Sequence, residues 1–347
     1  ASRLTSEGLR VGDVSRGVKE VLLLSLAKHI GRPSVVITSE HLFAPGIAFA
    51  WPSEVTGQSY EVASGVAQIL GNKAGLHLVP PDLLSVPLIG VRRYDALTKT
   101  YAKGQEIAPE AVTKALVDAG YEADPDLDRA GSFHRTGDTL RVWGMGDRFQ
   151  HRLNWFGDHL ETIVRAEGED EVDLPSLRLF PASITDPKGA ARLRDYIKLA
   201  GAIIAGEEYL LEAADDLAGL PQLSFTFKKE SSVLQLPWTR ADVTHNRSEL
   251  HELVKKYQDE GWHVGLARWE GPAVDLPDGV EDVRLPITEG VKCPDIKWIV
   301  FTPSEILTRP PKPTKRHSDR LQLNLDPGQL ITHRDHGIGK FLGLVRR

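Results

Sequence analysis

The chain has 347 residues, of which 41% are hydrophobic and 26% charged, and 48 acidic against 42 basic side chains give a formal net charge of −6. This length predicts two to four domains, and the acidic balance argues against a protein that binds DNA over its whole surface. The single cysteine, Cys293, excludes an internal disulfide framework and zinc sites built on clustered cysteines. No apolar run approaches the 18 residues of a membrane span and no apolar signal segment begins the sequence, so we expect a cytoplasmic protein without a membrane anchor.

The first part of the chain alternates helical and extended patterns. Apolar side chains recur at helical spacing around Leu22 and Val66, and a short apolar run follows each stretch, at residues 35–38 and 76–79. Helices and strands in alternation predict a parallel sheet. We therefore assign residues 1–95 to the first part of an α/β domain.

The same pattern returns later in the chain. Residues 177–181 form an apolar run, and Asp186-Pro187 suits the start of a helix whose apolar stripe continues to Ile204. We expect residues 174–221 to complete the α/β domain and residues 222–308 to form a second, small α/β domain.

Residues 96–173 interrupt the α/β domain and have a different pattern. A helix at 109–119 precedes short strands at 139–143, 152–156 and 159–164. Gly157-Asp158 separates the last two strands, and a two-residue loop with glycine first suits a type II′ hairpin. We predict an inserted small α+β domain.

Alternation along these strands defines a candidate binding face. Leu153 and Trp155 suit the core, so their neighbours along the strand point outward. The outward-facing candidates are Arg152, Phe156 and Arg141, with Arg135 in the turn that precedes them. Arginine beside an exposed aromatic ring on a rigid sheet is typical of protein-interaction hot spots. The alternative is that the aromatic rings pack beneath a neighbouring domain.

Motifs for catalysis are absent from the sequence. No Gly-x-x-x-x-Gly-Lys-Ser/Thr loop occurs, so we interpret Lys19 as a solvated lysine in the first turn of a helix and Asp170–Asp173 as a charged loop. Cys293 lacks an evident histidine partner, and His333 and His336 have neither a cysteine nor a cluster of carboxylates nearby. We predict no catalytic residue, no cofactor and no bound metal.

The end of the chain reads as the start of a further domain. A basic, proline-rich linker at 309–322 leads to residues 323–347, where a strand ends at His333, residues 335–339 form a glycine-bent loop and 341–344 form the next strand. Two short strands do not bury a core by themselves. We expect an incomplete β segment, as in a fragment of a longer protein.

The segment that contains His333, His336, Gly337 and Gly339 resembles the opening of the RNA-polymerase-interaction domain of bacterial transcription-repair coupling factors. Residues 287–290 and 301–307 resemble the segments that precede that domain in the same family. Phe180-Pro181-Ala182-Ser183 resembles the segment that follows the insertion in UvrB relatives. The resemblance implies a UvrB-like parallel-sheet α/β domain with an inserted small α+β domain, followed by a second small α/β domain and an incomplete β segment.

The resemblance also implies a non-catalytic recruitment role. In the family the insertion binds the excision-repair protein UvrA, and Arg152 and Phe156 match its arginine and phenylalanine. A further family arginine stands where this chain has Thr136, one residue after Arg135. The intact protein is expected to bind the RNA polymerase beta subunit through its completed C-terminal domain and to be a DNA-dependent ATPase, whereas the fragment is expected to bind DNA weakly or not at all. The alternative is a degenerate nucleotide- or DNA-binding module related to UvrB.

Overall fold

The computed structural model describes residues 8–12, 14–40, 42–43, 48–52, 59–71, 75–167, 170–214, 217, 219–244, 247–268, 278–306, 330–333 and 337–340. The chain separates into two compact units, Ala1–Ile306 and Leu307–Arg347. Among the described residues, no helix is long and apolar enough to cross a membrane.

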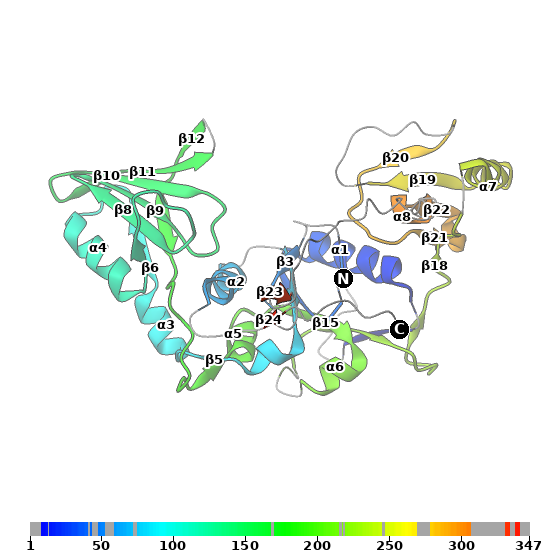
Figure 1. Cartoon of the computed structure of the whole chain (residues 1–347), viewed down its shortest axis with the longest axis horizontal. Coiled ribbons are helices and arrows are strands. Elements are labelled where there is room, and N and C mark those ends of the chain that lie inside the picture. Colours follow the sequence, from blue (N-terminus) through cyan, green and yellow to red (C-terminus); the bar gives the residue numbers. More distant parts are fainter. Residues whose placement is uncertain are drawn as a thin grey trace. The chain divides into compact units, whose positions relative to one another are not determined.

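A parallel sheet forms the centre of the first unit, as the alternating pattern predicts (Figure 1). The described part of this sheet has seven strands in the order β17-β1-β16-β15-β2-β4-β3, and every neighbouring pair is parallel. Its strands are β1 Leu9–Gly12, β2 Pro33–Ile37, β3 Ala48–Ala50, β4 Gly75–Val79, β15 Ile203–Glu207, β16 Gln222–Thr226 and β17 Leu234–Gln235. Strands β15 and β16, which follow the insertion, lie between β1 and β2.

Helices cover both faces of the central sheet. On one face α1 (Arg16–Ile30) buries Leu23 against Val36 of β2. On the other face Val35 packs with Val66 of α2 (Tyr60–Leu70) and with α5 (Leu193–Leu199). Sheets buried on both faces carry near-continuous apolar strands, and all five residues of β2 are buried. Three further short helices are η1 Pro81–Ser85, α3 Val91–Leu97 and α6 Glu208–Glu212.

The predicted helix between residues 186 and 204 is shorter than expected. Helix α5 begins at Leu193 and ends at Leu199. Gly201 then adopts a φ of +58°, and Ile203 begins strand β15. The helical spacing of Ile203 and Ile204 was therefore misleading, because β-branched residues beyond a helix-ending glycine favour a strand.

Two short antiparallel pairs connect the central sheet to the insertion. Strand β5 (Pro87–Leu88) pairs with β14 (Ala191–Arg192), and β6 (Lys99–Ala102) pairs with β13 (Ser176–Leu179). The chain therefore leaves and re-enters the α/β domain along adjacent strands.

The insertion is a sheet packed on one helix, α4 (Pro109–Asp118) (Figure 1). As far as the structure describes it, this sheet has six strands in the order β12-β11-β10-β9-β8-β7, antiparallel except for β7 with β8. The strands are β7 Glu122–Ala123, β8 Ser132–Thr136, β9 Thr139–Trp143, β10 Gln150–Phe156, β11 His159–Glu167 and β12 Asp170–Asp173. Val112 and Leu116 of α4 belong to the same core as Leu140 and Leu153 of the sheet.

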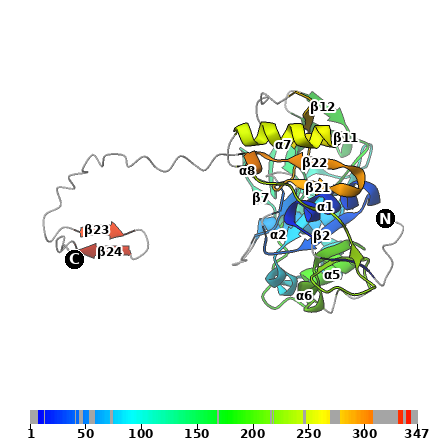
Figure 2. The same ribbon diagram turned by 90° about the vertical axis from the view of Figure 1, so that its right-hand side faces the viewer.

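A third sheet follows, with helix α7 (Arg247–Asp259) packed on it (Figure 2). Its described strands are β18 Thr239–Arg240, β21 Val291–Cys293, β22 Trp298–Phe301, β19 His263–Ala267 and β20 Glu281–Val283, in that order. Short helices η3 Pro294–Ile296 and α8 Pro303–Ile306 flank β22. Leu250, Val254 and Tyr257 of α7 bury against Ile299 and Phe301.

The second unit contains one described hairpin. Strand β23 (Leu330–His333) pairs antiparallel with β24 (Gly337–Lys340), and His333 lies opposite Gly337. The prediction that Gly337 and Gly339 form a loop is wrong, since both lie in β24. His336, the linker at 309–322 and the strand expected at 341–344 lie outside the described residues.

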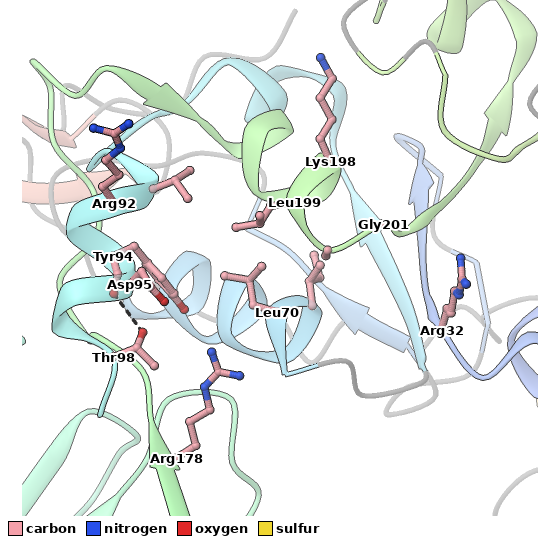
Figure 3. Close-up of a pocket in the computed structure, with 13 residues that line it drawn as sticks. Arg32, Leu70, Arg92, Tyr94, Asp95, Thr98, Arg178, Lys198, Leu199 and Gly201 are labelled. Carbon is pink, nitrogen blue, oxygen red and sulfur yellow. Dashed lines mark hydrogen bonds between the residues drawn. The ribbon is translucent and has the colours of Figure 1, made fainter. Parts of the chain in front are cut away.

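A cavity of about 850 Å³ opens among α2, α3 and α5 (Figure 3). Arg178 of β13 also lines it. This cavity lies on the first unit, apart from the sheet face that the sequence singles out.

Candidate functional site

Two tight hairpins shape the sheet of the insertion. Gly137 and Gly157 each have a φ of +58°, and the aspartate that follows each has a negative φ. Positive φ at the first position alone is the pattern of a type II′ turn. The sequence predicted this turn at Gly157, and the structure has it at Gly137 as well.

Strand β10 divides its side chains between a core face and an outer face, as predicted. Leu153 is fully buried, and Trp155 donates a hydrogen bond from Nε1 to the carbonyl oxygen of Ile107 at 2.8 Å. Arg152 is partly exposed, and Phe156 has an exposed fraction of 76%. The side chains beneath the face are therefore packed in the core, and those above it are partly or largely exposed.

The outer face carries two adjacent arginines. Arg152 of β10 lies opposite Arg141 of β9, and Arg141 lies opposite His134 of β8. Arg141 donates from Nη2 to the carbonyl oxygen of Pro125 at 2.5 Å. This hydrogen bond fixes the guanidinium close to the sheet, so Arg141 lies beside the more exposed Arg152.

Phe156 is the most exposed of the large hydrophobic side chains in the described part of the chain. It ends β10 at the Gly157 turn and lies opposite His159. The alternative in which this ring packs beneath a neighbouring domain does not hold for the described residues. An exposed phenylalanine and a partly exposed arginine on the same face of a strand are residue types that are enriched in interaction hot spots.

Arg135 does not lie in a turn, and that prediction is wrong. It belongs to β8 and lies opposite Leu140, a fully buried residue, so it shares the helix-facing side of the sheet. Its Nη2 pairs with Glu110 of α4 at 2.6 Å, and its Nε donates to Gly137. The hydrogen bond with Arg135 lowers the pKa of the Glu110 carboxyl. Arg135 thus ties the sheet to its helix, and a role in partner binding stays a prediction.

The acidic run Asp170–Asp173 is a strand rather than a loop. It forms the edge strand β12, in which Glu171 lies opposite Ala166 of β11. Glu171 Oε2 accepts a hydrogen bond from Arg152 Nη2 at 2.8 Å, and both side chains are about half exposed. Pairing with β11 provides backbone hydrogen bonds along one side of this strand despite its low β propensity. The outcome is an ion pair at the edge of the candidate face.

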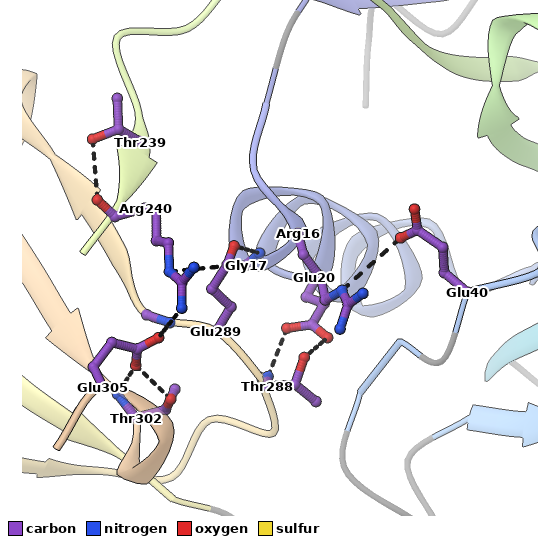
Figure 4. A network of polar contacts seen from close by, with 11 residues as sticks. Arg16, Gly17, Glu20, Glu40, Thr239, Arg240, Thr288, Glu289, Thr302 and Glu305 are labelled. Carbon is purple, nitrogen blue, oxygen red and sulfur yellow. Dashed lines mark hydrogen bonds and ion pairs between the residues drawn. The ribbon is translucent and has the colours of Figure 1, made fainter. Parts of the chain in front are cut away.

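The segment around Lys19, which has no phosphate-loop motif, lies at the start of α1. Lys19 is not solvated: only 13% of its side chain is exposed, and it pairs with Glu207 at the end of β15. The backbone N–H of Gly17 donates to Glu289 Oε2 at 3.2 Å (Figure 4). A carboxylate at a helix N-terminus satisfies a free amide and interacts favourably with the helix dipole. Glu289 belongs to the third sheet's segment, so the anion at this helix comes from the chain itself.

A network of acidic side chains extends this contact (Figure 4). Glu289 pairs with Arg240 at 3.3 Å, and Arg240 lies 3.7 Å from the buried Glu305. Glu20 of α1 is fully buried and accepts from both the N–H and the hydroxyl of Thr288, at 2.7 and 2.6 Å. Sequence reasoning missed these residues, because 268 positions separate Glu20 from Thr288 and no local pattern marks their contact.

The remaining candidates for chemistry have ordinary surroundings. Burial is the main cause that raises the pKa of the Cys293 thiol to about 12, and a protonated thiol is a poor nucleophile. Among the described residues, no group of three or more histidine, cysteine, aspartate or glutamate side chains is placed to hold a metal ion. Neither Cys293 nor a metal-binding cluster therefore adds a candidate for chemistry among the described residues.

Comparisons with known proteins agree with the place of this face. Residues 100–184 match the family model of the UvrB interaction domain. The chain is 30% identical over 95 residues to UvrABC system protein B of Halobacterium salinarum, an alignment that covers 26% of the chain and 14% of that relative. It is 28% identical over 133 residues to the protein of the same name from Lactobacillus johnsonii, covering 35% of the chain and 20% of the relative.

The UvrABC system protein B of Mycobacterium bovis is 29% identical over 119 residues, which are 33% of the chain and 15% of the relative. The chain thus matches less than a quarter of the length of each of these relatives. The chain is UvrB-like in this part, and the inserted sheet described above lies inside the matched residues.

Proposed function

We propose that this chain is a recruitment part of a bacterial transcription-repair coupling factor and that the outer face of its inserted sheet binds UvrA. The observation that carries the proposal is the exposed ring of Phe156, which lies four residues after Arg152 on the outer face of β10, a strand whose opposite face is packed. The match of residues 100–184 to the UvrB interaction domain supports a partner in nucleotide excision repair. Coupling to RNA polymerase rests on the resemblance of the segment around His333, Gly337 and Gly339.

The proposed role of the chain is recruitment rather than catalysis, and the contacts at the start of α1 support this. A phosphate loop presents backbone amides to a nucleotide, whereas the Gly17 amide here is bound to Glu289. A side chain at Gly17 is also excluded, because its Cβ would lie 2.2 Å from the carbonyl oxygen of Glu289. These contacts support a front α/β domain that works as a scaffold. DNA is expected to bind weakly or not at all at the partner-binding face.

A binding titration with purified UvrA tests the proposal. The double variant Arg152→Ala, Phe156→Ala removes the two central side chains of the face. A matched control, Lys114→Ala with Val117→Ala, removes one cation and one exposed apolar group from the opposite, helical side of the insertion. Hot-spot truncation is expected to cost about 2 kcal/mol or more, which is about thirtyfold in affinity. Equal affinities of the double variant and the control would remove the site assignment.

A further inference from the structure

Four cations surround the cavity of about 850 Å³ among α2, α3 and α5. They come from separate elements and share this hollow with one carboxylate, Asp95; the cations are Arg32, Arg92, Arg178 and Lys198. In Figure 3 the guanidinium of Arg178 points into the hollow from β13, whereas the charged ends of Arg92 and Lys198 point outward and Arg32 lies farther away. A concave site in which one sign of charge predominates raises the local concentration of the opposite ion.

These cations are free of the partners that neutralise other arginines of this protein. Across the described residues, none of the four forms an ion pair with a carboxylate. By contrast, Arg10, Arg129 and Arg152 each pair with glutamate at the surface. The contrast is pronounced because the chain as a whole carries an excess of acidic residues. Unpaired cations gathered in a hollow of an acidic protein favour an anionic ligand.

Aromatic packing holds the wall of the hollow in place. Tyr94 is 3% exposed, and its ring packs edge-on against Tyr196 with centroids 5.1 Å apart. The guanidinium carbon of Arg178 lies 4.8 Å from the ring centroid of Phe180, a cation–π contact. Phe180 also packs against Tyr94, with centroids 6.3 Å apart. Arg178 and Tyr94 are therefore positioned by one aromatic cluster.

The hydroxyl of Tyr94 is a donor without an acceptor among the described residues. Burial raises the pKa of Tyr94, so the hydroxyl keeps its proton and remains a neutral donor. Buried polar groups in proteins are nearly always hydrogen-bonded. An oxygen-rich ligand at this wall supplies the acceptor that the protein lacks.

The charged surface continues beyond the cavity. A second hollow of about 420 Å³ also contains Arg178, and Arg148 and Arg165 of the insertion line it. Arg178 therefore lies between two hollows, with cations on either side. Each hollow also contains one carboxylate, Asp95 or Asp147, so cations outnumber acidic groups in both, as suits a ligand with more than one negative group.

We propose that the hollow around Arg178 binds phosphate groups, with Arg178 as the central cation and the Tyr94 hydroxyl as a neutral donor. Arginine presents a planar fork of N–H donors that matches phosphate oxygens. The phosphates come either from a small molecule with two phosphates or from the backbone of a nucleic acid strand. The site is separate from the face around Arg152 and Phe156, so it does not depend on the proposed recruitment function.

Two titrations at constant ionic strength distinguish the sources. Calorimetry with sodium pyrophosphate measures the small-molecule arm, and fluorescence anisotropy with a labelled 15-residue oligothymidylate measures the backbone arm. Binding of pyrophosphate alone assigns a small phosphate ligand, and oligothymidylate binding that pyrophosphate displaces assigns a nucleic acid backbone. If the wild-type protein binds neither probe, the proposal is overturned.

Variants connect the binding to the named residues. Arg178→Gln is expected to weaken binding by about tenfold or more, since a hydrogen bond to a charged group is lost. Tyr94→Phe keeps the ring and removes only the donor, so a smaller loss of about fivefold is expected. Lys255→Gln on α7 removes one exposed cation far along the chain and serves as the control. Equal losses for Arg178→Gln and Lys255→Gln would show unspecific charge attraction and overturn the site.

The packing of Arg178 on Phe180 makes a folding control necessary. Arg178→Lys keeps the positive charge and is expected to retain part of the phosphate binding. It tests the site if Arg178→Gln does not fold. The Arg152→Ala, Phe156→Ala double variant is expected to bind both probes as the wild type does. Loss of phosphate binding in that double variant would contradict the separation of the two sites.

Discussion

Replacement of Glu20 by alanine is expected to loosen the joint between α1 and the segment that follows the third sheet's β20. The Glu20 carboxylate is fully buried and accepts three hydrogen bonds, from Phe43 N at 2.8 Å, Thr288 N at 2.7 Å and Thr288 Oγ1 at 2.6 Å. Truncation to alanine removes the acceptor for all three donors and leaves a gap in the helix surface. The variant therefore perturbs one contact that connects two distant parts of the chain.

The structure sets the size of the effect. A buried donor that loses its acceptor costs about 1–3 kcal/mol. Three donors share the Glu20 carboxylate, and partial relaxation of the Thr288 segment lets water reach some of them. We therefore expect Glu20→Ala to lower the free energy of unfolding by about 3–5 kcal/mol, the lower part of the range for three such donors.

Urea denaturation of the first unit in the full chain measures this loss. Glu40→Gln is the control, because the Glu40 side chain is 43% exposed and lies 4.0 Å from its partner Arg16. Such a surface pair contributes about 0–1 kcal/mol. A midpoint for Glu20→Ala that equals that of Glu40→Gln, with an unchanged slope, would refute the role of this joint.

Two further predictions concern the edge of the partner-binding face and a buried histidine. Glu171→Gln releases Arg152 from its ion pair and is expected to tighten UvrA binding by less than about fivefold, because exposed pairs contribute about 0.2–1 kcal/mol. A titration with UvrA at low salt measures this change. Weaker binding, or no change, would contradict the idea that Glu171 competes with UvrA for Arg152. Burial lowers the pKa of His77 from 6.5 to about 4, so the folded protein binds fewer protons than the unfolded chain at acidic pH. The contribution of neutral His77 to the free energy of unfolding is therefore fully present above pH ~6.5, and about 3 kcal/mol of it is lost as the pH drops to about 4. His77→Gln is expected to flatten this decline in thermal unfolding measured between pH 4 and 7, and an unchanged decline would exclude His77 as its source.

Local patterns in the sequence predicted a parallel sheet, of which they identified β2 and β4, and they predicted the faces of β10. They assigned residues from 222 onward to a separate domain, whereas β16 and β17 belong to the central sheet. Alternation along five residues predicted that Leu153 would be buried and Phe156 exposed, and both are. The pattern succeeds because the side chains of a strand alternate strictly, so one buried tryptophan fixes the orientation of its neighbours. The chemical role of the face cannot be derived in this way, since a hot spot depends on the partner.

Arg135 shows how one missed turn changes a site. The sequence pattern placed Arg135 in a turn before the strand at 139–143 and predicted no strand before Gly137, although Gly137-Asp138 has the same two-residue form as Gly157-Asp158. With the hairpin centred on Gly137, Arg135 pairs with Leu140 and faces the helix. The register of a hairpin follows from its turn, and a shift by one residue moves a side chain to the other face. The Gly137-Asp138 dipeptide was the signal in the sequence that could have predicted this hairpin.

Other features depend on contacts between distant parts of the chain. Asp170–Asp173 has the composition of a loop, and only the edge of β11 makes it a strand. The cavity around Arg178 brings together residues from four elements, and each of its cations is an ordinary surface residue when viewed along the sequence. Tertiary packing decides such cases, and single-sequence propensity has no access to it.

The strand order of the central sheet has a consequence for the chain during its synthesis. Strand β1 has β16 and β17 as its neighbours, and β2 has β15 and β4, so the first strand cannot pair until residue 226 has left the ribosome. At 5–20 residues per second, roughly 10 to 40 s pass between the translation of β1 and of β16. The insertion pairs almost entirely with its own sequence neighbours, and it is translated within this interval. On the nascent chain, the face around Arg152 and Phe156 is thus expected to reach its final form before the domain that carries it.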